Sequence, residues 1–178
     1  MGGTLVCASS PLTRRGLLAA TGAVGAAALL AGCGFELRHA PKLPFGTIAL
    51  LGFRPDSQVA ALLRQQIDST STTRVVDSIA QAQVVLRIYN DASERIVEVS
   101  TAAGQVRELQ LRSRLVFQLQ TPTEIELIPR TQLLLTRDLT YTEEAALGKE
   151  QEEATLYRGM QTDIVGQLLR RLAAVHMP

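Results

Sequence analysis

The chain is poor in the residues that build most metal centres and many active sites. Its 178 residues include two cysteines, two histidines and no tryptophan, which argues against a metal cluster or a disulfide framework. Neither sign of charge dominates, since 18 lysines and arginines face 17 acidic residues. The chain therefore lacks the basic excess typical of nonspecific nucleic-acid binding. A hydrophobic content of 46% with 20% charged residues is typical of a globular protein.

Motifs that mark common enzymes are also missing. The chain contains no P-loop, no G-x-S-x-G, no H-E-x-x-H and no paired-cysteine motif. His39 and His176 lie near the ends of the predicted domain, away from any expected pocket. Glu150 and Glu153 could imitate a catalytic carboxylate pair, but acidic residues at a helix N-terminus complement the helix dipole. We therefore expect no catalytic residues, no cofactor and no metal.

The N-terminal segment has the pattern of an export signal. Arg14 and Arg15 precede an apolar run at residues 16–30, which is shorter than the ~20 residues that a spanning helix needs. The run ends in the tetrapeptide LAGC, which closes at Cys33. This end resembles the lipobox of bacterial lipoproteins, in which the signal is removed and the cysteine is acylated. The resemblance implies that residues 1–32 are a signal peptide and that Cys33 is the lipidated residue.

Two details of the signal bear on localisation. Gly34 follows the cysteine, where lipoproteins retained at the inner membrane usually carry Asp, so the outer membrane is favoured. The arginine pair partly resembles a twin-arginine signal, and the export route, Sec or twin-arginine, stays open. We expect a lipidated tether over residues 33–45 and a single domain over residues 46–178.

Hydrophobic periodicity predicts the elements of that domain. In order, these are a strand at 47–53, a helix capped by Asp56 and running to about Asp68, a long bulged strand at 84–99, a hairpin at 101–105, an alternating strand at 108–119, a turn at 121–123, a strand at 125–141 with Pro129 at a bulge or edge, and a helix at 149–176. The order β-α-β-β-β-α predicts an α+β fold: a two-layer sandwich with a four-stranded mixed sheet and two helices on one face.

The alternating strand assigns side chains to the two faces of this sheet. Leucine and phenylalanine residues from Leu109 to Leu119 recur on one face, while Arg112 and Arg114 fall on the other. Both helices cover the apolar face, so no predicted element covers the face with the two arginines. These residues therefore meet either water or a partner.

The predicted N-terminus of the mature chain resembles a known family. Residues 33–38, CGFELR, are similar to the mature start of the lipopolysaccharide-assembly lipoprotein LptE family, which reads C-G-aromatic-x-L-R. The element order, the Gly104–Gln105 hairpin and the 145–149 approach to the last helix match as well. The resemblance implies a non-enzymatic outer-membrane lipoprotein that sits inside the LptD β-barrel, assists its assembly and contacts lipopolysaccharide.

Connectivity suggests where lipopolysaccharide would touch the domain. The hairpin, the loop at 142–149 and the end of the first strand at 52–54 are expected at one rim, opposite the Cys33 tether. Lys149 aligns with a basic position of the family, whereas the family's second basic position is Ala102 here, with Arg107 as a possible substitute. The alternative is a solvated Lys149 near acidic residues of the same helix.

A second functional class shares the lipobox and the small α+β domain. An auxiliary lipoprotein of a lipid-trafficking transporter complex would also be anchored, non-enzymatic and compact. The identity of the membrane partner, a β-barrel or an inner-membrane ATPase complex, separates the two.

Overall fold

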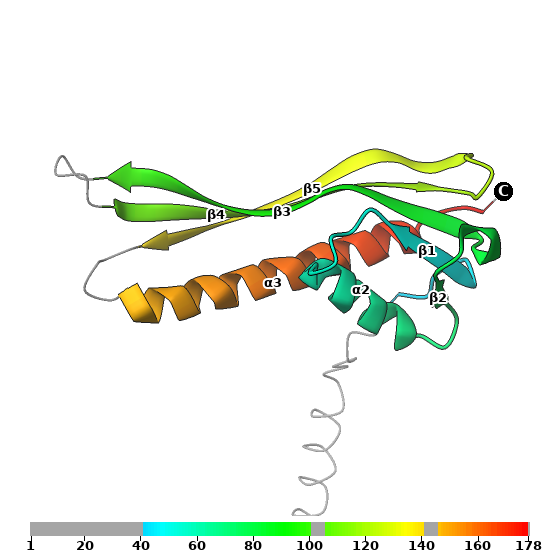
Figure 1. Ribbon diagram of the computed structural model, residues 1–178, viewed down its shortest axis with the longest axis horizontal. Coiled ribbons are helices and arrows are strands. Elements are labelled where there is room, and N and C mark those ends of the chain that lie inside the picture. Colours follow the sequence, from blue (N-terminus) through cyan, green and yellow to red (C-terminus); the bar gives the residue numbers. More distant parts are fainter. Residues whose placement is uncertain (1–40, 101–105, 141–145, 178) are drawn as a thin grey trace, which may run out of the picture. The chain divides into compact units, whose positions relative to one another are not determined.

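The computed structural model describes residues 41–100, 106–140 and 146–177 (Figure 1). Its elements are β1 (Thr47–Leu51), α2 (Gln58–Asp68), β2 (Arg74–Val76), a 3-10 turn η1 (Ile79–Gln81), β3 (Val84–Ser100), β4 (Val106–Gln120), β5 (Glu126–Thr140) and α3 (Ala146–Ala173). The sheet and the two helices form the two layers of an α+β fold, as predicted.

The sheet has five strands, in the order β2-β1-β3-β4-β5, and the prediction of four was wrong. β1 is parallel to both β2 and β3, while β3, β4 and β5 form an antiparallel meander, so the sheet is mixed. The missed strand β2 has only three residues and follows the polar turn after α2. Three residues are too few to show a hydrophobic period, so the strand is recognisable only from its pairing with β1.

The strands differ in length, which gives the sheet two distinct ends. β1 pairs with only the first four residues of β3, Val84 to Arg87. β3, β4 and β5 continue far beyond β1 to the point where Ser100 pairs with Val106. We call the end with β1, β2 and α2 the crossover end and the end where β3 meets β4 the hairpin end (Figure 1).

The main core lies at the crossover end, between the sheet and both helices. Its 18 buried residues come from β1, α2, β3, β4, β5, the second half of α3 and the segment before β1. Leu43 and Phe45 belong to it, so packing begins within the segment that the sequence assigns to the tether. The burial of Leu111, Leu115 and Phe117 confirms the predicted inner face of β4.

A smaller distal cluster packs the hairpin end. Leu109, Leu111, Leu139 and Met160 are its buried residues, and Leu156 and Tyr157 of α3 pack against it. On α3, Met160 is buried in this cluster, whereas Leu156 is only partly buried. The helix begins at Ala146, three residues before its predicted start.

Polar side chains on the inner sheet face connect the sheet to the helices. Their partners lie on α2 and α3: Asp91 accepts a hydrogen bond from Ser57, Arg95 pairs with Glu153 at 3.4 Å, and Arg137 pairs with Asp163 at 3.5 Å. Ser57 is the N-cap of α2, because its hydroxyl accepts from the amide of Ala60 at 3.0 Å. The predicted cap, Asp56, was wrong by one residue, since its carboxylate instead pairs with Arg54.

Two bulges interrupt the sheet at the same level of β4. The register shifts between Ile88 and Asn90 in β3, and between the β5 residues that pair with Phe117 and Leu119. Pro129 lies within the second shift and on an edge strand, which confirms its predicted role. The bulge predicted in β3 is confirmed as well.

The turn after β1 lies against the first of these bulges and not at the hairpin end. Gly52 has φ of 85°, and a Cβ atom there would lie 2.2 Å from the carbonyl oxygen of Ile88. Ile88 is far along β3 from Ser100, where the hairpin end lies. The expectation that residues 52–54 join the rim with the hairpin was therefore wrong, because β1 is too short to reach it.

Candidate functional site

The start of α3 brings Lys149 to the hairpin end of the domain. Its Nζ atom lies 2.8 Å from Oε2 of Glu152, one turn along the helix, and its side chain is 22% exposed. Lys149 thus pairs with Glu152 of its own helix, whereas the alternative from the sequence was a solvated Lys149 near Glu150 and Glu153. Arg107 is the second residue of β4, and its side chain falls outside the described part, as does Ala102.

A second set of contacts holds this part of α3 on the sheet. The hydroxyl of Tyr157 donates to the carbonyl oxygen of Glu94 at 2.8 Å, and Glu153 pairs with Arg95. Burial raises the pKa of Tyr157 above its usual value of 10.0, Glu153 and Glu94 add to the increase, and Arg95 opposes it. The phenol therefore stays protonated and keeps donating its hydrogen bond.

The predicted arginine pair does lie on the face opposite the helices. Arg112 pairs with Glu98 at 3.9 Å and Arg114 with Glu94 at 3.8 Å. The Arg112 Nε atom also donates to Oε1 of Gln110 at 2.6 Å. About a third of each arginine side chain is exposed. The face thus carries compensated ion pairs, which the sequence could have indicated only if the register of β3 against β4 were known.

One atom on this face lacks a partner. The Nε atom of Arg114 is buried and makes no hydrogen bond. Leu134 of β5 lies directly opposite Arg114 of β4, and the Leu134 side chain is 45% exposed. Among the described residues, the Arg114 Nε atom is the one buried side-chain nitrogen or oxygen without a hydrogen-bond partner.

The bulges place a further polar cluster on the same face, which the sequence did not reveal. The guanidinium carbon of Arg130 lies 4.3 Å from the centre of the Tyr89 ring. The Tyr89 hydroxyl donates to Gln118 at 2.6 Å, and Gln118 donates to Glu126 at 2.7 Å. Tyr89 is 43% exposed, so an amphipathic ring is presented to the exterior.

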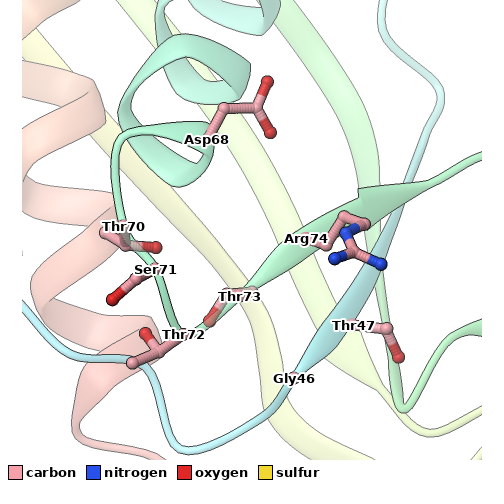
Figure 2. Close-up of a pocket in the computed structure, with 8 residues that line it drawn as sticks. All are labelled: Gly46, Thr47, Asp68, Thr70, Ser71, Thr72, Thr73 and Arg74. Atoms are coloured by element: carbon pink, nitrogen blue, oxygen red, sulfur yellow. The ribbon is translucent and has the colours of Figure 1, made fainter.

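At the crossover end, a cavity opens between the end of α2 and the starts of β1 and β2 (Figure 2). No candidate site was predicted here from the sequence. The hydroxyl-rich composition of residues 69–73 was the available signal, and the position of β2 was needed to interpret it.

The described residues contain no group of three or more His, Cys, Asp or Glu that could hold a metal ion. Within the same ranges, no helix is long and apolar enough to cross a membrane. His176 is exposed beyond the end of α3, while His39 and the predicted lipidation residue Cys33 lie outside the described part.

The LptE family model, described as lipopolysaccharide-assembly, matches residues 45–172. The chain belongs to the LptE family, a family of lipopolysaccharide-assembly proteins that are non-enzymatic lipoproteins associated with the outer membrane. Among curated proteins, none gives a significant match.

Solved structures share the fold. Lipoprotein B from Nitrosomonas europaea is 29% identical, with a TM-score of 0.66 over 79% of this chain and 91% of that one. The rare lipoprotein B from Shewanella oneidensis is 22% identical, with a TM-score of 0.61 over 72% of this chain and 95% of that one. A minor lipoprotein from Acinetobacter baumannii is 18% identical, with a TM-score of 0.60 over 77% and 100%. The last two show the fold alone.

Proposed function

We propose that this protein is an outer-membrane lipoprotein that plugs the LptD β-barrel, assists its assembly and contacts lipopolysaccharide during insertion at the cell surface. The observation that carries the proposal is the match of the LptE family model across nearly the whole described domain. The position of Arg112 and Arg114 on a sheet face without a helix supports it, because such a face is available for docking.

The open face is the proposed barrel contact. Exposed ion pairs such as Arg112–Glu98 contribute at most ~1 kcal/mol to folding, so they can be changed without unfolding the domain. The double change Arg112→Glu and Arg114→Glu is expected to weaken the complex while thermal unfolding stays cooperative. The matched control is Arg170→Glu with Arg171→Glu, at the last turn of α3. A complex of unchanged stability in mild detergent would remove this face from the interface.

Lys149 and Arg107 are the proposed lipopolysaccharide contacts at the hairpin end. The partner of Lys149 is an exposed carboxylate on the same helix, and a lipid phosphate could replace it at little cost. Lys149→Asp is expected to weaken lipopolysaccharide binding and antibiotic exclusion while the barrel still co-purifies. Binding equal to that of the wild type at low salt, where such contacts are strongest, would exclude Lys149.

Cys33 is the proposed lipid attachment site. Cys33→Ala is expected to block processing of the signal peptide and to leave precursor in the inner-membrane fraction. Metabolic labelling with a palmitate analogue measures this directly. Label that persists on the variant would place the anchor on another residue.

Co-purification from detergent-solubilised membranes tests the proposal as a whole. The expected partner is a stoichiometric, heat-modifiable β-barrel. Recovery of an inner-membrane ATPase complex without a barrel would instead support an auxiliary lipoprotein of a lipid-trafficking transporter.

A further inference from the structure

The cavity at the crossover end has a volume of about 390 Å³, and the elements that line it, α2, β1 and β2, lie away from the hairpin end (Figure 1). It is lined by Gly46, Thr47, Asp68, Thr70, Ser71, Thr72, Thr73 and Arg74. Figure 2 shows the turn residues 70–72 on one side, Arg74 and Thr47 on the other, and Asp68 at the end of α2 between them. The lining is polar and carries one charge of each sign.

The wall formed by α2 is negative. Asp68 is the last residue of this helix, where the carbonyl groups give the helix dipole its negative pole. The last turn of α2 contains no basic residue, and Asp68 makes no ion pair with any described residue. A carboxylate at this end of a helix is unfavourable unless a cation compensates it. This wall is therefore suited to an ammonium group.

The opposite wall is positive and rich in donors. Arg74 opens β2, and its backbone amide donates to the carbonyl of Gly46 at 2.9 Å, which fixes the strand while the guanidinium stays exposed. No carboxylate among the described residues lies within 4.0 Å of that guanidinium. Arg74 and Asp68 thus share one cavity without pairing with each other.

The hydroxyl groups of the turn fall into two sets. Those of Thr70 and Thr73 donate to backbone carbonyls, at 2.6 Å to Ile67 and at 2.8 Å to Phe45. Those of Ser71 and Thr72 make no hydrogen bond within the described part of the chain. On the other side of the cavity, the Arg74 guanidinium has several N–H donors that can serve the oxygens of a phosphate group.

We propose that this cavity binds a phosphoethanolamine group. The ammonium faces Asp68 and the end of α2, and the phosphate faces Arg74 on the other side of the cavity. A phosphate alone would be repelled by Asp68 and an amine alone by Arg74, whereas a ligand with both charges is attracted at each end. The cavity therefore selects a zwitterion with a phosphate at one end.

Two sources could supply this group, a membrane phospholipid or a soluble diester. The phospholipid source rests on the proposed function, because it requires the anchor at Cys33. That residue precedes Leu43, where packing begins, by 10 positions, which allows a reach of up to about 35 Å in extended chain. The cavity can therefore reach the surface of the membrane that holds the anchor.

Titration of the full protein in detergent with glycerophosphoethanolamine, followed by amide NMR, tests the chemistry. We expect saturable shifts at residues 68–74, at least tenfold weaker binding for Arg74→Glu and severalfold weaker binding for Asp68→Asn. Arg158→Glu, which makes the same charge change on the exposed side of α3, should bind as the wild type does. Glycerol 3-phosphate or ethanolamine binding as tightly as the diester, or no shifts at all, would overturn the proposal.

The source is tested with the lipidated protein in vesicles of phosphatidylethanolamine or of phosphatidylcholine. Slower hydrogen exchange at residues 68–74 in the first vesicles alone supports the phospholipid. Equal exchange in both would overturn the phospholipid source. Loss of barrel co-purification would bear on the proposed function and not on this cavity, because neither titration contains the barrel.

Discussion

The two ends of the domain differ in how their residues are held. At the crossover end, 18 buried residues from both helices and four strands share one core. At the hairpin end, four buried residues and a few polar contacts fix the first half of α3 to the long strands. Stability is therefore concentrated at the crossover end, and the proposed lipopolysaccharide contacts lie on the less stable extension.

Matched leucines in β4 give the largest expected contrast between the ends. Leu115→Ala, in the main core, should lower the free energy of unfolding by about 3–5 kcal/mol, because its cavity is enclosed on all sides. Leu109→Ala, in the distal cluster, should lower it by about 2 kcal/mol, because few neighbours surround it. Urea unfolding measures both. Equal losses would contradict the concentration of stability at the crossover end.

Replacing two glycines by alanine should change the stability of the protein in opposite directions. Gly52→Ala forces a positive φ and a close contact with Ile88 at the crossover end, and should destabilise the protein by at least about 2 kcal/mol. Gly148→Ala, in the first turn of α3, meets open space and should stabilise it by about 0.5–1 kcal/mol. Thermal unfolding provides the comparison. A neutral Gly52→Ala would mean that the turn after β1 can shift away from β3.

The next largest change in stability is expected at the N-cap of α2. Ser57→Ala removes the acceptor for the amide of Ala60 and the donor to Asp91, and should cost about 1–2 kcal/mol. Asp56→Ala, at the neighbouring position that the sequence favoured, should change stability by less than about 0.5 kcal/mol, because its pair with Arg54 is exposed. Equal effects in urea unfolding would show that the cap is shared between the two residues.

A smaller loss than that of Ser57→Ala is expected from Tyr157 at the hairpin end. Tyr157→Phe removes a hydrogen bond to Glu94 and should cost about 1 kcal/mol at pH 8. Because the pKa of Tyr157 is raised in the folded protein, the unfolded chain loses its proton first as the pH rises above about 10. The advantage of the wild type over the variant should therefore shrink as the pH rises above about 10. A constant difference would mean that the phenol titrates alike in both states.

The sequence predicted most of the fold because its elements are long and strongly periodic. The alternation of β4 and the two bulges were correct. β2 was missed because three residues carry no period, and the turn at 52–54 was misplaced because a strand pattern does not show where a short strand stops along a longer neighbour.

The candidate sites were harder to predict for a physical reason. The sequence placed Arg112 and Arg114 on the correct face, but their carboxylate partners come from another strand and depend on the register. The cavity at the crossover end depends on β2, whose position only the fold reveals. Contacts between side chains of different elements depend on how the elements pair in the fold, and the local sequence pattern does not reveal that pairing.

Hydrogen exchange along α3 tests the division between the two ends most directly, since this helix spans both. The account predicts that amides of Ile164 to Leu172 exchange only through global unfolding, with protection equal to the free energy of unfolding. Amides of Glu152 to Leu156 should exchange through local opening, several kcal/mol below that value. Uniform protection along the whole helix would contradict the account.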